Sequence, residues 1–349
     1  MAFDPEGTTL LVDRDDTVGT YSFRLVGRTW HEAEIFRFRD REPHQAGERI
    51  YEELRAMARS ANGRDGKQAA QLRYQRLENL GVQLWQSAVP QAVQRQFWDQ
   101  GPRLGSFTVI GEHDAVPWEL LYPVNGRERG DGFLSEQVPL VRLVYDHVPA
   151  RRLSLNRPAF IVPPGSPPDA LSEVAAVRAC IGTADTSAPL TTLQQLSALI
   201  DLGHTGLLHF ACHNSFTDKG SSVTMADAPF DPIDLSKAAE SGSLRDGQPL
   251  VFFNACRSAG EIPWFGSTLG WAPQFLRAGA GAFVGTLWPV RSDSALAFAK
   301  AFYRHLVIDQ QPLGEASLAA RRAIREESGD PTRLAYAVYG SPSARTTVG

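Results

Sequence analysis

The sequence predicts an α/β fold built on a mostly parallel sheet. Residues 249–256 (PLVFFNAC) form an apolar run without polar alternation, which is typical of a strand buried on both faces. Residues 206–212 (GLLHFAC) repeat this pattern, and from Ala159 onward such runs alternate with helical segments. A chain of 349 residues is long enough for two domains or for one large α/β body.

The first 150 residues predict a small β unit followed by helices. Residues 1–19 are rich in Asp, Gly and Thr and offer little to bury, so we expect a flexible tail. Beyond it we expect a hairpin of two strands, two helices that end before Pro90, and two further strands. These segments are 20–26, 33–38, 47–61, 67–88, 105–110 and 138–145. The polar stretch 147–157 then predicts a linker, with a domain boundary near residue 150.

The second half predicts strands and helices in alternation. Asp169 is expected to cap the first helix, and Ser292 or Asp293 to cap a long helix near the end. The expected strands are 159–162, 206–212, 221–225, 249–256, 281–287 and the segment 336–339. The expected helices are 169–182, 193–202, 235–241, 268–278, 292–307 and 313–327, and residues 261–266 are expected to be irregular.

A thiol and an imidazole follow two of the predicted strands. Cys256 ends the run at 249–256, and His213 follows the run at 206–212. Carboxyl ends of parallel strands are where open α/β sheets bind ligands, and an imidazole there can take the thiol proton and return it to a leaving amine. The alternative is a buried cysteine beside a histidine whose hydrogen bonds are satisfied.

Four sequence blocks resemble the CHAT family, which is itself similar to caspases and separases. The blocks are 116–121 (VPWELL), 208–213 (LHFACH), 254–258 (NACRS) and 281–290 (GAFVGTLWPV). The resemblance covers about residues 105–340. It implies a caspase-like sandwich with a degenerate amino-terminal half, residues 20–150, and a catalytic half, residues 151–345. It also implies His213 as general base and Cys256 as nucleophile.

The residue after the histidine departs from the family pattern. The family usually has glycine there, whereas this chain has Asn214. We expect the backbone amides of Cys256 and Asn214 to bind the oxyanion, since both stand at the strand ends. Asparagine tolerates a positive φ better than most residues, so the same turn is expected.

Substrate preference is predicted from the residues around the cysteine. Relatives of the caspase-like clan that cut after Arg or Lys commonly place an acid two residues before the cysteine, where this chain has Asn254. We therefore expect a neutral or apolar residue before the cut, unless Asp218, Asp227 or Asp231 reaches the pocket. Trp264 is a further candidate for lining it.

Two other groups of residues allow an alternative interpretation. His113 and Asp114 could be catalytic, but no cysteine lies in that half, so residues 116–121 are interpreted as core. The segment 209–213 and Cys256 contain zinc ligand types, but their spacing lacks the pairs typical of zinc sites. We therefore expect no metal. No Gly-rich phosphate loop is present, so nucleotide hydrolysis is not supported and no cofactor is expected.

Composition narrows the class of protein further. The net charge of −4 indicates no general affinity for nucleic acid. No apolar stretch reaches the roughly 20 residues that a membrane span requires, and no secretory signal begins the chain, so we expect a cytoplasmic protein. Its three cysteines are expected to be free thiols.

The resemblance also implies a biological role. We expect a bacterial cysteine endopeptidase of a defence or cell-death system that cuts a partner protein, such as a gasdermin-like one, once an activating protein engages residues 20–100. Few lysines among many arginines indicate a GC-rich bacterial genome. The alternatives are a catalytically inactive scaffold that binds partners through the same cleft and a thiol hydrolase that is not a peptidase.

Overall fold

The computed structural model describes most of the chain. The described residues are 7–15, 20–27, 31–36, 43–60, 66–99, 105–111, 116–125, 128–129, 132–145, 147–183, 185–217, 219–256, 258–264, 267–324 and 330–347. They include His213 and Cys256, whereas His113, Asp114 and Asp218 lie outside them.

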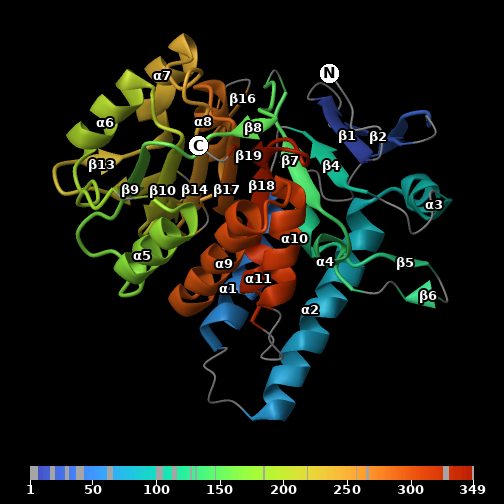
Figure 1. Cartoon of the computed structure of the whole chain (residues 1–349). Coiled ribbons are helices and arrows are strands. Elements are labelled where there is room, and N and C mark those ends of the chain that lie inside the picture. Colours follow the sequence, from blue (N-terminus) through green and yellow to red (C-terminus); the bar gives the residue numbers. More distant parts are fainter. Residues whose placement is uncertain are drawn as a thin grey trace.

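One ten-stranded sheet runs through the molecule (Figure 1). The strand order is β3-β2-β1-β4-β7-β18-β17-β14-β10-β9. In chain order these strands are β1 (Thr8–Asp15), β2 (Thr20–Val26), β3 (Glu34–Phe36), β4 (Phe107–Ile110), β7 (Leu140–Leu143), β9 (Pro158–Ile161), β10 (Leu207–Ala211), β14 (Leu250–Asn254), β17 (Ala282–Thr286) and β18 (Tyr336–Tyr339).

The sheet consists of two parallel blocks. Strands β9, β10, β14 and β17 are parallel to one another, as are β1, β4, β7 and β18. The blocks meet at the antiparallel pair β17–β18, and β2 and β3 extend the second block as antiparallel strands. The sheet is therefore continuous across residue 150, and the predicted domain boundary there stays a prediction.

Helices cover both faces of the sheet and make a sandwich. Buried side chains of α5 (Ala170–Ile181), α9 (Ser292–Tyr303) and α10 (Leu313–Ala323) belong to the core of one face. The core of the other face includes side chains of α1 (Pro43–Ser60), α2 (Lys67–Ala88), α3 (Gln91–Asp99), α6 (Leu193–Leu202), α7 (Ser236–Ser241) and α8 (Trp271–Arg277). Every residue of β10, β14 and β17 is buried, as their unbroken apolar runs predict. The α/β fold class is confirmed.

The remaining elements are short. The short helices are α4 (Leu134–Gln137), α11 (Thr332–Ala335), the 3-10 helices η1 (Trp118–Leu120) and η2 (Pro232–Leu235) and the π-helix η3 (Arg304–Ile308). The short strands are β5 (Val124–Asn125), β6 (Glu128–Arg129), β8 (Arg152–Leu153), β11 (Ser215–Thr217), β12 (Gly220–Thr224), β13 (Pro229–Phe230), β15 (Glu261–Trp264), β16 (Ser267–Gly270) and β19 (Arg345–Thr346).

The amino-terminal segment differs from the predicted flexible tail. Residues 8–15 form β1, which pairs with β2 on one side and β4 on the other. Leu10 is fully buried there. The three apolar residues 10–12 are therefore enough to place the strand in the sheet, although their neighbours in the sequence are polar. The acidic composition of residues 13–16 concealed this strand.

Three further segments correct the predicted elements. Helix α3 follows Pro90 directly, although no helix was expected there. Residues 261–264 and 267–270, expected to be irregular and then helical, form the antiparallel strand pair β15–β16 before α8 begins. The N-cap of α9 is Arg291 rather than Ser292 or Asp293, because Ser292 is already the first helical residue.

Two buried ion pairs stabilise the amino-terminal part, and one of them joins it to the carboxyl-terminal end. Arg142 donates two hydrogen bonds to Glu119, from Nε at 2.8 Å and from Nη2 at 2.6 Å. Arg333, near the carboxyl end, donates to Glu136 of α4 at 2.6 Å. Both pairs are almost fully buried. Removing one partner of such a pair leaves an uncompensated buried charge, which costs about 3–5 kcal/mol.

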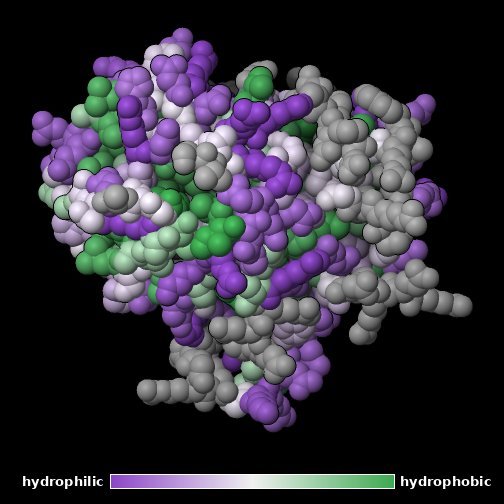
Figure 2. Space-filling model, viewed as in Figure 1, coloured by the Kyte–Doolittle hydropathy of each residue, from purple (hydrophilic) through white to green (hydrophobic). Residues whose placement is uncertain are grey.

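The surface shows where this fold exposes apolar groups. Figure 2, seen from the side of α5, α9 and α10, is mostly hydrophilic, with apolar residues gathered in the half that carries α5 and β9. No helix within the described ranges is both long enough and apolar enough to span a membrane.

Candidate active site

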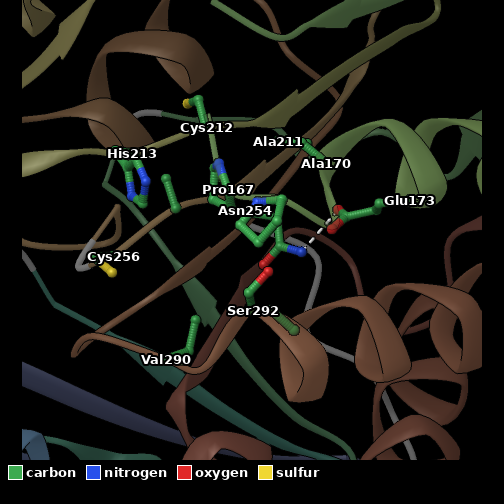
Figure 3. Close-up of a pocket in the computed structure, with 13 residues that line it drawn as sticks. Pro167, Ala170, Glu173, Ala211, Cys212, His213, Asn254, Cys256, Val290 and Ser292 are labelled. Carbon is green, nitrogen blue, oxygen red and sulfur yellow. Dashed lines mark hydrogen bonds between the residues drawn. The ribbon is translucent and has the colours of Figure 1, made fainter. Parts of the chain in front are cut away.

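Two adjacent parallel strands bring His213 and Cys256 to the same edge of the sheet. Strands β10 and β14 pair in register, with Ala211 opposite Asn254. His213 and Cys256 each lie two residues beyond these last paired positions. They therefore leave the sheet at the same level, and Figure 3 shows both side chains at one end of the same pocket. The topology thus produces the juxtaposition that the sequence predicted.

The pocket is a cavity of about 160 Å³ between β10, β14 and the starts of α5 and α9. His213 is exposed at its edge, and Cys256 is half-buried. The lining residues are Pro167, Pro168, Ala170, Glu173, Ala211, Cys212, His213, Asn254, Ala255, Cys256, Val290, Ser292 and Ala295. A substrate side chain that enters this cavity passes both candidate catalytic groups.

Two hydroxyl groups hold the turn that carries Cys256. Ser258 Oγ donates to the carbonyl of Phe253 at 2.7 Å and accepts from the amide of Thr286 at 2.9 Å. Thr286 Oγ1 donates to the carbonyl of Ala255 at 2.6 Å. These bonds tie the turn to the end of β17, so the position of the thiol is set by two strands, β14 and β17, rather than by one.

Burial raises the pKa of the Cys256 thiol above its ordinary value. A hydrogen bond from the backbone of Val290, the positive charge of Arg55 in α1 and the backbone of Cys256 itself all act in the opposite direction. The net effect leaves the thiol protonated at neutral pH, so it needs a base to become a nucleophile. Cys212 is fully buried, and burial raises the pKa of its thiol further. Cys212 is therefore an inert core residue.

Asn214 differs from its predicted role. Its backbone does not adopt a positive φ, so the argument from left-handed geometry is wrong. Instead its buried side chain joins two loops, because Nδ2 donates to the carbonyl of Cys256 at 2.9 Å and Oδ1 accepts from Trp271 Nε1 at 3.1 Å. The amides of Asn214 and Cys256 as oxyanion donors remain a prediction.

A buried polar network lies behind the pocket. Glu173 Oε1 accepts from Asn254 Nδ2 at 2.7 Å and lies 2.8 Å from His209 Nε2. His209 Nδ1 is 3.0 Å from the hydroxyl of Tyr303, and Tyr336 donates to Asn254 Oδ1 at 2.8 Å. His209 thus has both ring nitrogens engaged in the core and takes no part in the thiol chemistry.

Among the predicted specificity residues that the structure describes, Asn254 lines the pocket. Asp227 is exposed and accepts hydrogen bonds from the amides of Leu193 and Gln194, so it caps α6 instead. The amide of Asp231 is bonded to Asp234 in the loop before α7. Trp264 ends β15.

Sequence reasoning missed Glu173 and Ser258. Glu173 stands in the first turn of α5, far from both motifs in the chain, and nothing in its neighbourhood marks it. Ser258 was visible beside the cysteine, but its hydrogen bonds depend on the position of β17. Within the described part of the chain, no three His, Cys, Asp or Glu residues are grouped so that they could hold a metal ion.

The fold and the family define a caspase-like cysteine peptidase. The chain belongs to the CHAT domain family, whose profile matches residues 78–342. No curated protein matches the chain by sequence.

Solved structures of cysteine proteinases share the fold. The Arg-specific cysteine proteinase gingipain R superposes with a TM-score of 0.51 at 13% identity, over 73% of this chain and 67% of that one. The complex of the Porphyromonas gingivalis RgpB pro- and mature domains superposes with a TM-score of 0.51 at 14% identity, over 73% of this chain and 68% of that one. The Saccharomyces cerevisiae separase–securin complex superposes with a TM-score of 0.55 at 11% identity, over 96% of this chain and 30% of that one. At these identities the likeness shows the fold alone.

Proposed function

We propose that this chain is an endopeptidase that cuts proteins through an acyl-thioester on Cys256. His213 takes the thiol proton while the sulfur attacks the scissile carbonyl carbon. It then returns that proton to the leaving amine as the peptide bond breaks, and the thioester forms. A water molecule, deprotonated by His213, next attacks the thioester carbonyl and releases the acid product and the thiol. The observation that carries this proposal is the position of both side chains beyond paired strand ends, beside one cavity.

The proposed biological setting is a bacterial defence or cell-death system. The substrate is a partner protein, such as a gasdermin-like pore former, and a second protein supplies the trigger, since an unregulated protease would harm its own cell. A trigger that binds only the competent conformation raises activity by shifting population. Family membership supports this setting, and the purified chain alone is then expected to cleave poorly.

The test combines labelling with co-expression. Iodoacetamide labelling of the intact protein, mapped by mass spectrometry, should favour Cys256 over Cys180 and Cys212. The chain is then co-expressed with its neighbouring genes, and Cys256→Ala and His213→Ala should each abolish cleavage while the melting temperature stays within a few degrees of wild type.

Each alternative predicts a different result. Full proteolysis by His213→Ala would rule out the dyad. Binding of a neighbouring gene product without cleavage, equal in wild type and Cys256→Ala, would indicate a scaffold. Labelling of Cys256 with turnover of thioesters or esters but not of peptides would indicate another thiol hydrolase. Full digestion of unrelated proteins by the isolated chain would exclude latency and favour a constitutive processing peptidase.

A further inference from the structure

The cavity beside Cys256 ends on a buried carboxylate. Glu173 lines this cavity although only 4% of its surface is exposed. Figure 3 shows Cys256 and His213 at one end of the pocket and Glu173 at the other, with Asn254 between them. A side chain that enters beside the thiol therefore points toward Glu173.

One carboxylate oxygen is occupied and the other is available. Oε1 lies within hydrogen-bond distance of His209 Nε2, at 2.8 Å, and of Asn254 Nδ2, at 2.7 Å. Oε2 makes no hydrogen bond with any residue that the structure describes, and it is not among the fully buried orphan atoms. A ligand in the cavity can therefore reach an acceptor that the protein leaves open.

The groups around this carboxylate supply hydrogen bonds but no full positive charge. With the proton of His209 on Nε2, this nitrogen donates to Glu173, and Nδ1 accepts from the hydroxyl of Tyr303. In this neutral tautomer both ring nitrogens of His209 and the hydroxyl of Tyr303 have a partner. An imidazolium would leave the Tyr303 hydroxyl proton without an acceptor in the described part of the chain. Among the residues that the structure describes, no Lys or Arg lines the cavity.

Buried charges in proteins are normally paired, so the missing partner points to the ligand. We propose that the cavity binds the side chain of a lysine or arginine whose carbonyl Cys256 attacks, and that Glu173 is the specificity-determining residue. This inference rests on the proposed peptidase function and names its substrate class. An ammonium or guanidinium at Oε2 completes the buried pair through a charge-assisted hydrogen bond.

The size of the cavity is compatible with this occupant. Its volume of about 160 Å³ is several times the ~30 Å³ that one water molecule takes up in the liquid. Pro167, Pro168, Ala170 and Val290 give the cavity apolar walls, along which the methylene groups of a long basic side chain can pack.

This assignment reverses the specificity predicted from the sequence. The neutral Asn254 indicated a neutral or apolar residue before the cut, because no acid stands two residues before the cysteine. In the structure the acid comes from α5, and Asn254 holds it in place through its amide. The carboxylate thus reaches the same pocket from a different element.

The test compares two inhibitors that differ by the terminal ammonium group of the side chain. Peptidyl chloromethylketones ending in lysine or in norleucine are reacted with the full-length protein, and the rate of Cys256 modification is followed by mass spectrometry. We expect the lysine compound to react on the order of 10- to 100-fold faster, given the strength of a charge-assisted hydrogen bond. In Glu173→Gln this ratio should fall to about threefold or less, because a neutral amide keeps the shape and loses the charge. Asp227→Asn, which removes an exposed acid outside the cavity, should keep the wild-type ratio.

The outcomes separate this inference from the proposed function. Labelling of Cys256 by iodoacetamide with equal rates for the two ketones, or a faster norleucine compound, would overturn the basic preference and leave the peptidase proposal standing. Failure of every reagent to modify Cys256 would contradict both the basic preference and the peptidase proposal. If Glu173→Gln does not fold, the wild-type ratio alone still decides the preference. A wild-type ratio that persists in folded Glu173→Gln would assign the preference to another residue.

Discussion

At the scale of single residues, the state of the Cys256 thiol decides how catalysis begins. Burial raises its pKa, and the opposing charge and amides do not outweigh this effect. In the proposed mechanism the reaction therefore starts from a thiol rather than from a preformed thiolate, and the proton leaves when the substrate is attacked.

The first prediction concerns the pH dependence of labelling. Since a raised pKa means a smaller thiolate fraction at neutral pH, the iodoacetamide rate at Cys256 should keep rising above pH 8 and show no plateau near neutrality. Stopped reactions analysed by mass spectrometry between pH 6 and 10 measure this profile. A fast rate that is already constant below pH 7 would show a preformed thiolate and contradict the prediction.

Asn214 provides the second prediction at this scale. Asn214→Gly removes the hydrogen bonds to the Cys256 carbonyl and to Trp271. The free energy of unfolding should fall by about 1–3 kcal/mol. Labelling of Cys256 and substrate turnover should slow by more than substrate binding weakens. Trp271→Phe is the comparison variant, since it removes the Nε1 donor together with part of the buried ring and keeps the bond between Asn214 and Cys256. Equal effects of both variants on kcat would show that the bond to Cys256 has no separate role.

Some residues of the candidate site could be predicted from the sequence and others could not. His213 and Cys256 were predictable because each follows an apolar strand, and parallel strands place such residues together. Glu173 was not predictable, because its side chain acts across the sandwich and its position in a helix gives no sign of the cavity. Asn214 was singled out, but for its backbone rather than for its side chain.

At the scale of elements, the end of β17 determines where the cysteine turn lies. Gly285 allows Ser258 to approach the strand, since a Cβ at this position would lie 2.8 Å from Ser258 Oγ and 2.6 Å from the ring of Phe283. Both distances are shorter than a real Cβ contact, so a side chain here forces the turn or the ring to move.

The third prediction follows from this contact. Gly285→Ala should destabilise the protein by about 1–3 kcal/mol through overpacking. It should also lower kcat by up to ~100-fold, because a displacement of about 1 Å at the nucleophile has that effect. Gly66→Ala is the matched control, since a Cβ there meets nothing within 4 Å. Urea unfolding and turnover of the co-expressed substrate measure the two effects, and a fully active Gly285→Ala would refute the proposed anchoring.

The elements that were predicted correctly and those that were missed differ in their surroundings. Strands β10, β14 and β17 are buried on both faces, so their composition alone identified them. Strand β1 was missed because most of its side chains are polar, and its place depends on pairing with β2 and β4 rather than on its own pattern. Strand pair β15–β16 contains Pro263 and short polar residues, which resemble a loop in sequence.

At the scale of the whole molecule, the amino-terminal part contributes to the catalytic edge. Tyr51 of α1 packs against Trp288 with ring centroids 6.2 Å apart, and Arg55 of the same helix acts electrostatically on Cys256. Tyr51 and Trp288 are 237 positions apart in the sequence, and Arg55 and Cys256 are 201 apart, so no local pattern could predict these contacts. A protein that engages residues 20–100 could therefore reach the nucleophile through α1.

The last prediction tests this connection. The positive charge of Arg55 lowers the pKa of Cys256 against the larger effect of burial, so Arg55→Gln should raise that pKa further. The thiolate fraction at a fixed pH then falls, and the labelling profile shifts to higher pH with a slower rate at pH 8. Arg59→Gln is the control, because Arg59 is exposed in the last turn of the same helix and does not act on the thiol. If both variants keep the wild-type profile, α1 does not influence the nucleophile electrostatically, and an activating partner would have to act on Cys256 by another route.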